Sequence, residues 1–157
     1  DSSDGQAKTK NSWALRLARL RTTPEVYMAL FDDAWMKGFQ EQWNAEPALK
    51  DALAKIDFNS VIGYGFPGDA QCLGFIDVRA GECVEAGAYD GRDLNWDLRA
   101  EQKNWEKWLS KEIGMTGLGL AFSTGKLKFK KGDFKAMISD PRMAGPFIKS
   151  FAAMGRV

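Results

Sequence analysis

A short segment in the second half of the chain alternates strictly between lysine and apolar side chains, and it constrains the fold more than any other part of the sequence. In an extended backbone, Lys126, Lys128 and Lys130 lie on one side. Leu127 and Phe129 then lie on the other side, which is the period of a half-buried strand. The segment therefore predicts a strand with one basic, wet face and one apolar face.

Glycines bracket this strand, and a helix is expected directly after it. Gly125 and Gly132 stand at its two ends, and the side chain of Asp133 is placed to cap the following helix. Asp140 and Pro141 then end that helix, because proline cannot continue it. A basic strand thus leads straight into apolar helical sequence.

The first third of the chain has helical periodicity. Thr23, Pro24 and Glu25 form a helix-start pattern, in which a capping hydroxyl precedes a proline and an acid in the first turn. Aromatic residues then recur every four positions and predict one broad helical face. These residues are Tyr27, Phe31, Trp35, Phe39 and Trp43.

The remaining elements indicate an α+β fold with a five-stranded, mostly antiparallel sheet covered by helices. The first four strands should form an antiparallel meander with one wet face, which in the last of them carries Asp97 and Arg99. Strands are predicted over 60–66, 71–79, 82–89 and 94–100, helices over 47–56 and 103–113, a flexible glycine-rich stretch over 114–120, and a last apolar helix over 146–154.

The chain is expected to hold one domain, residues 23–157, preceded by a disordered and basic extension, residues 1–22. From Lys8 to Arg21 the charge is entirely basic, with leucines and a tryptophan interleaved. One interpretation is an amphipathic segment that contacts a membrane surface or a protein partner. The other is a basic helix that packs on its own domain, or a frayed extension.

The two cysteines are expected to be free thiols. If the second hairpin turns at Ala80 and Gly81, Cys83 lies opposite Val78. Cys72 is then six residues further along the strand, roughly 20 Å away, whereas a disulfide requires Cα atoms within about 7 Å. Free thiols predict a reducing compartment and hence a cytoplasmic protein.

Several kinds of chemistry are excluded by composition. The chain has no histidine, so histidine triads and histidine-ligated metals are absent. A formal net charge of +1 gives no electrostatic case for binding nucleic acid. The acids Asp90, Asp93, Asp97 and Glu101 lack a calcium-loop pattern and are interpreted as a solvated strand face. We therefore expect no enzyme activity, no metal and no cofactor.

Binding of an apolar ligand fits the sequence better. The aromatic helix, the glycine-rich stretch and the apolar C-terminal helix supply more apolar surface than a sheet with one wet face needs, and a gap between helices and sheet would form an apolar tunnel. The candidate ligand-binding residues are Phe75, Trp96, Trp105, Trp108, Leu109, Met115, Leu118, Leu120, Phe122, Phe129, Phe134, Met137, Phe147 and Phe151.

Residues 125–133, GKLKFKKGD, resemble the lysine-rich strand motif of the sterol carrier protein 2 (SCP2) family of lipid-binding domains. Weaker similarities follow in the family's order at 76–81, 94–100, 105–109, 114 and 121–122, so that the resemblance covers about half of the chain. It implies an SCP2-like fold with an apolar tunnel for a fatty acyl chain, a sterol or a similar lipid, and a role as a carrier or an accessory protein.

Two hypotheses of function remain open at this point. The first is non-catalytic binding of a hydrophobic ligand in the tunnel. The second is an accessory subunit that docks on a partner enzyme through its apolar C-terminal helix and the basic segment from Lys8 to Arg21. A third, a hydrolase or isomerase on a similar fold, is disfavoured by the missing histidine.

Overall fold

The computed structural model describes residues 29–111 and 113–157. The chain divides into two compact units, residues 1–30 and Phe31–Val157, and the fold below is that of the second unit. The basic segment from Lys8 to Arg21 and the helix start expected at Thr23 lie outside the described residues, so both stay predictions.

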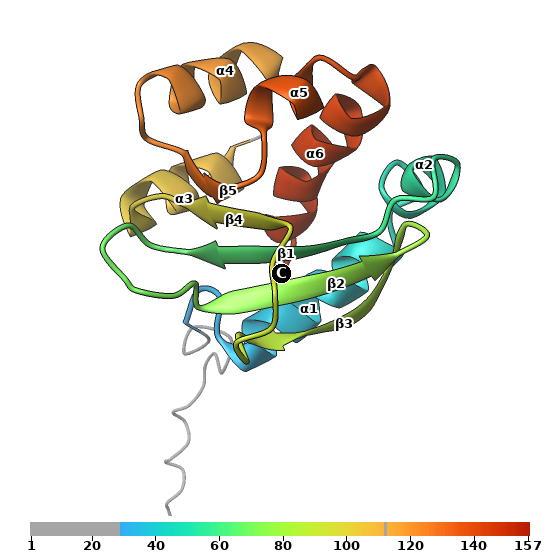
Figure 1. Ribbon diagram of the computed structural model, residues 1–157, viewed down its shortest axis with the longest axis horizontal. Helices are drawn as coiled ribbons and strands as arrows, with labels where there is room; N and C mark the ends of the chain where they lie inside the picture. The colour runs from blue at the N-terminus through green and yellow to red at the C-terminus, as the bar shows by residue number, and fades with distance from the viewer. Residues whose placement is uncertain (1–28, 112) are drawn as a thin grey trace, which may run out of the picture. The chain divides into compact units, whose positions relative to one another are not determined.

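The described residues form an α+β fold (Figure 1). The elements in chain order are α1 (Asp33–Asn44), α2 (Lys50–Ala54), β1 (Ser60–Gly65), β2 (Gly74–Arg79), β3 (Glu82–Ala88), β4 (Trp96–Arg99), α3 (Gln102–Ser110), α4 (Met115–Ser123), β5 (Lys128–Lys131), α5 (Phe134–Ile138) and α6 (Pro141–Met154).

The five strands form one sheet in the order β3-β2-β1-β4-β5, which confirms the predicted fold class. The expected meander is wrong in one respect, because β4 pairs with β1 in parallel and not with β3. The connection from β3 to β4 crosses the sheet (Figure 1). Asn95 fixes its end, since its backbone N–H donates to Val61 and its side chain accepts from the Val61 N–H, both at 2.8 Å.

Helix α1 begins after Phe31, so Phe31 is not part of the helical face on which it was predicted. Phe31 has a φ of 68°, and the side chain of Asp32 accepts a hydrogen bond from the Trp35 N–H at 2.8 Å, so the helix starts at Asp33. The predicted aromatic spacing holds within the helix, where Trp35, Phe39 and Trp43 are buried. In Figure 1, α1 runs behind β2 and β3.

The basic strand and its cap are confirmed in outline. Strand β5 spans four residues at the edge of the sheet and pairs with β4. Leu127 is buried just before it, and Phe129 is half-buried. The side chain of Asp133 accepts a hydrogen bond from the Ala136 N–H at 3.1 Å and caps α5, as predicted.

Two predictions for the C-terminal third are wrong. The stretch 114–120, expected to be flexible, belongs mostly to α4, because packing of Leu118 and Ala121 outweighs the low helix propensity of its glycines. The last helix begins at Pro141, five residues before Pro146, because proline suits the first turn of a helix and the Asp140 side chain caps it. Pro146 therefore lies inside α6.

The expected wet face of β4 is also wrong. Asp97 is 8% exposed and Arg99 only 1%. The guanidinium of Arg99 donates to both carboxylate oxygens of Asp97, at 2.7 and 3.1 Å. It also donates to the backbone carbonyls of Phe66, at 3.1 Å, and Asp69, at 2.8 Å, so the loop after β1 folds over the pair and buries it.

Removing Arg99 should destabilise the fold strongly. Arg99→Met leaves Asp97 buried without a counter-ion, and we expect a loss of about 3–5 kcal/mol in the free energy of unfolding measured with urea. The double variant Asp97→Leu/Arg99→Met should recover part of this loss. Arg142→Met, which removes an exposed ion pair with Asp140, should leave the urea midpoint nearly unchanged. Equal losses of stability in Arg99→Met and Arg142→Met would contradict the stabilising role of the buried Arg99–Asp97 pair.

The prediction of two free thiols is confirmed. Cys83 pairs with Val78 in the sheet, as expected, and neither cysteine forms a disulfide. Both thiols are buried, and this desolvation raises the pKa of Cys72 to about 11 and that of Cys83 to about 12. Both therefore stay protonated and unreactive at neutral pH.

The buried thiols predict a stability that falls at high pH. In the unfolded chain they lose their protons near pH 9, whereas in the folded chain they keep them up to about pH 11, so the free energy of unfolding should fall as the pH rises between these values. Urea unfolding at pH 8 and 10 measures this fall, which should be smaller for Cys72→Ala/Cys83→Ala. Iodoacetamide at pH 8 should label the folded chain roughly a hundredfold more slowly than the unfolded chain.

Candidate functional site

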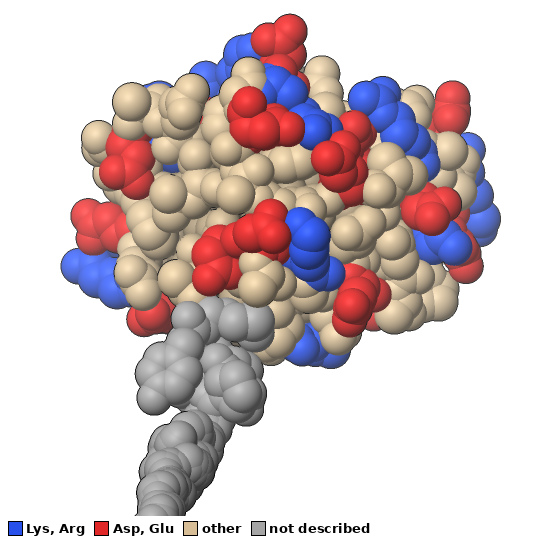
Figure 2. All heavy atoms as spheres, turned by 90° about the horizontal axis from the view of Figure 1, so that it is seen from below, with Lys and Arg blue, Asp and Glu red and all other residues tan. Residues whose placement is uncertain are grey.

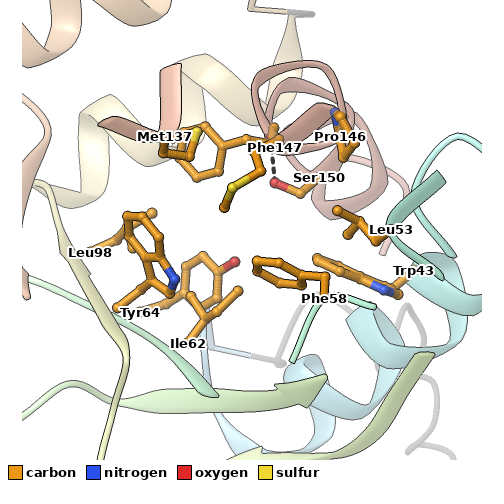
Figure 3. Close-up of a pocket in the computed structure, with 12 residues that line it drawn as sticks. Trp43, Leu53, Phe58, Ile62, Tyr64, Leu98, Met137, Pro146, Phe147 and Ser150 are labelled. Carbon is orange, nitrogen blue, oxygen red and sulfur yellow. Dashed lines mark hydrogen bonds between the residues drawn. The ribbon is translucent and has the colours of Figure 1, made fainter. Parts of the chain in front are cut away.

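An apolar cavity of about 40 Å³ lies between the sheet and the C-terminal helices (Figure 3). Such a space holds a few water molecules at most, whereas sites for small organic ligands measure roughly 300–1,000 Å³. The cavity is lined by Trp43, Leu53, Phe58, Ile62, Tyr64, Trp96, Leu98, Met137, Met143, Pro146, Phe147 and Ser150.

The parallel pairing of β1 with β4 creates the floor of the cavity. In this register Ile62 lies beside Trp96, and Tyr64 lies beside Leu98. Because alternate residues of a strand share a face, all four side chains point toward α6. Helices α1, α2, α5 and α6 supply most of the remaining walls.

Few polar atoms reach the cavity. The Ser150 hydroxyl donates to the Phe147 carbonyl at 2.5 Å, and the Trp43 indole N–H donates to the Gly81 carbonyl at 2.9 Å. The Tyr64 hydroxyl makes no hydrogen bond to any of the described residues, and in Figure 3 it points into the space beside Phe58. Burial raises the pKa of Tyr64, so this hydroxyl stays protonated and is free to donate.

The structure brings only some of the predicted ligand-binding residues to this cavity. Trp96, Met137 and Phe147 line it. An aromatic cluster of Phe122, Phe129 and Phe134 adjoins it, with the Phe129 ring 6.0 Å from those of both Trp96 and Phe147.

The other predicted residues lie elsewhere in the structure. The Phe75 ring lies beneath the Arg92 guanidinium, at 4.1 Å, on the opposite face of the sheet. Trp105, Leu118 and Phe151 are fully buried. Trp108 is buried and Leu109 half-buried on α3, whereas Met115 and Leu120 are exposed on α4.

Nine lining residues were not predicted as site residues. The signal for some of them was visible, since alternation places Ile62 and Tyr64 on one face of their strand. What the sequence did not reveal was the parallel pairing that sets this face beside β4. The nine residues are Trp43, Leu53, Phe58, Ile62, Tyr64, Leu98, Met143, Pro146 and Ser150.

The described residues show no other chemistry of note. Among residues 29–111 and 113–157, no cluster of acids and cysteines is arranged to hold a metal ion. Within the same ranges, no helix has both the length and the apolar character that a membrane crossing requires. On the face shown in Figure 2, acidic and basic side chains are interspersed.

Comparison with known proteins identifies the fold. No protein-family model and no curated protein matches the sequence. Among solved structures, a crystal structure of sterol carrier protein 2 superposes with a TM-score of 0.66 at 19% identity, over 82% of this chain and 99% of that one.

Two further solved structures share this architecture. A possible sterol carrier protein from Thermus thermophilus has a TM-score of 0.55 at 19% identity, over 82% of this chain and 87% of that one. UbiJ-SCP2, described as a ubiquinone synthesis protein, has a TM-score of 0.52 at 14% identity, over 79% of this chain and 90% of that one. The chain therefore has the SCP2-like fold that its lysine-rich strand motif predicted.

Proposed function

We propose that this chain binds a hydrophobic ligand without transforming it, and that it acts as a carrier or an accessory protein. The ligand would be a fatty acyl chain, a sterol or a similar lipid, seated in the apolar cavity beneath α6. The observation that carries the proposal is a cavity with predominantly apolar walls, which few polar atoms reach. The shared fold supports it, because two of the similar structures are described as a known and a possible sterol carrier protein.

A ligand of this size needs the cavity to widen, and the wall formed by α5 and α6 is suited to yield. Pro146 has no backbone N–H, so α6 lacks one hydrogen bond of its ladder beside the cavity. Met137 and Met143 line the same wall, and methionine side chains adapt readily to different shapes. Helix α5 has only five residues. Outward movement of this wall would enlarge the cavity without separating the strands.

The energetics allow such an opening. Burying an acyl chain of about sixteen carbons contributes at most roughly 13 kcal/mol, at about 0.8 kcal/mol per methylene. Association costs several kcal/mol, and a micromolar dissociation constant needs only about 8 kcal/mol. The balance can cover a modest cost of moving α5 and α6. We therefore expect micromolar affinity.

The Tyr64 hydroxyl is the natural anchor for the polar end of a ligand. It is buried, protonated and without a hydrogen-bond partner among the described residues. A ligand oxygen placed beside it would accept a hydrogen bond from this donor, and such a bond contributes about 1 kcal/mol net. The proposal therefore favours amphiphiles with an oxygen-bearing head over pure hydrocarbons.

The alternative function, an accessory subunit that docks on an enzyme, is supported by one comparison but not by the packing of α6. UbiJ-SCP2 is described as a ubiquinone synthesis protein, which favours a role beside enzymes. However, α6 is not a free apolar helix, because Ala144, Pro146, Phe151, Ala153 and Met154 are buried within the fold. A protein partner would therefore have to dock on another surface, or on the segment from Lys8 to Arg21.

Titration of the delipidated full chain with a fluorescent fatty acid tests the main proposal. We expect saturable binding in the micromolar range. Met143→Trp should weaken it at least about tenfold, because the larger side chain fills space that the ligand needs. The matched control Met115→Trp changes an exposed methionine outside the cavity and should bind as the unaltered chain does. Absence of saturable binding, or equal losses in the two variants, would refute the proposal.

Tyr64→Phe tests the anchor. Since a net hydrogen bond contributes about 1 kcal/mol, the variant should bind the fatty acid roughly fivefold more weakly. A fluorescent hydrocarbon without oxygen should bind both proteins equally, because it makes no hydrogen bond to lose. If the two ligands lose affinity by the same factor, Tyr64 contributes shape alone and the anchor is wrong.

A further inference from the structure

A second and larger hollow lies on the surface between α3 and α4. It measures about 410 Å³, roughly ten times the volume of the apolar cavity beneath α6. Its base is apolar and includes Trp108, Ile113 and Ala121. Gly114 and Gly117 also line it and, as glycines, place no side chain in it. The lining residues are Lys107, Trp108, Lys111, Ile113, Gly114, Gly117, Leu120, Ala121, Thr124 and Lys126.

An exposed leucine lies at this hollow. Leu120 of the nine-residue helix α4 is 59% exposed, more than any other large hydrophobic side chain among the described residues, and it lines the hollow. The inner side of α4 is already anchored by buried Leu118 and Ala121. The outward leucine therefore adds nothing to the core, and its burial elsewhere would be favourable.

Unpaired positive charge surrounds the same hollow. Lys107, Lys111 and Lys126 line it, and none of their ammonium groups has an ion pair or hydrogen bond to the described residues. No acidic residue is among the lining residues, although Glu112 lies outside the described part of the chain. By contrast, Lys37 and Lys103 each pair with a nearby acid. The hollow thus combines apolar contact surface with three free cations.

We propose that the α3–α4 surface, formed by Lys107, Lys111, Leu120 and Lys126, docks on a bilayer that contains anionic phospholipid. Leu120 would enter the headgroup region, and the lysine ammonium groups would contact lipid phosphates while their methylene stems cover the apolar base. The charge pattern selects this occupant, since a neutral apolar partner would leave three desolvated cations without counter-ions. The inference goes beyond ligand binding and does not depend on what occupies the cavity.

Sedimentation of the full chain with phospholipid vesicles tests this surface. The probes are vesicles of phosphatidylcholine alone and vesicles in which about one third is phosphatidylglycerol. We expect binding to the anionic vesicles, little binding to the neutral ones, and a loss of affinity in high salt. The triple variant Lys107→Gln/Lys111→Gln/Lys126→Gln should bind roughly a hundredfold more weakly, and Leu120→Ser at least about fivefold more weakly.

Matched controls separate this surface from general charge and hydrophobicity. Lys50→Gln/Lys55→Gln/Lys135→Gln removes the same charge elsewhere, and Val84→Ser removes another exposed apolar side chain, at 49%. Both control variants should retain at least about a third of the affinity for anionic vesicles. Every variant should also retain at least about a third of the affinity for the fluorescent fatty acid. All variants should first show unchanged urea midpoints.

The result that would overturn the proposal is equally specific. If the two triple variants lose affinity equally, vesicle binding follows net charge and not the α3–α4 surface. If neither the first triple variant nor Leu120→Ser loses affinity, any binding comes from another segment, such as Lys8 to Arg21, and the proposal fails. Neither outcome bears on the fatty-acid titration, so the two proposals fail separately.

Discussion

The packing of one indole holds the helical layer on the sheet. Trp105 of α3 is fully buried, and its indole N–H donates to the Gly65 carbonyl at the end of β1 at 3.0 Å. Its ring lies 5.0 Å from Phe31 and 6.0 Å from both Tyr64 and Phe151. A side chain that contacts β1 and α6 together sets their separation, because packed aromatic rings leave little slack. The wall of the cavity at Tyr64, whose ring packs against Trp105, is therefore held more firmly than the wall at Pro146.

Local patterns predicted local structure well, and pairings across the chain poorly. The Val78–Cys83 register followed from one turn, and the cap at Asp133 followed from one residue type next to an apolar run. The parallel pairing of β1 and β4 joins residues more than thirty positions apart, such as Ile62 and Trp96, and no nearby signal encodes it. The glycines of the stretch 114–120 led to a wrong prediction of flexibility, because helix propensity is a weak preference that tertiary packing overrides.

The candidate site follows the same rule: the sequence predicted apolar side chains, but not which of them lie next to one another. The sequence indicated which side chains were apolar, but it does not distinguish a tryptophan that faces a cavity, such as Trp96, from one that fills the core, such as Trp105. Only the three-dimensional arrangement separates these cases. Alternation likewise placed Asp97 and Arg99 on a wet face, because periodicity cannot reveal that a distant loop will fold over them.

The basic strand from which the fold was first inferred acquires a different meaning at the edge of the sheet. Among the described residues no further strand pairs with the outer side of β5, so its backbone groups form an open template on which another chain could add a strand. Lys128, Lys130 and Lys131 are exposed along this edge. A second copy brought alongside would meet the same charges, and the repulsion opposes edge-to-edge aggregation. The lysines of β5 thus oppose aggregation of the folded protein through this edge during expression and storage at high concentration.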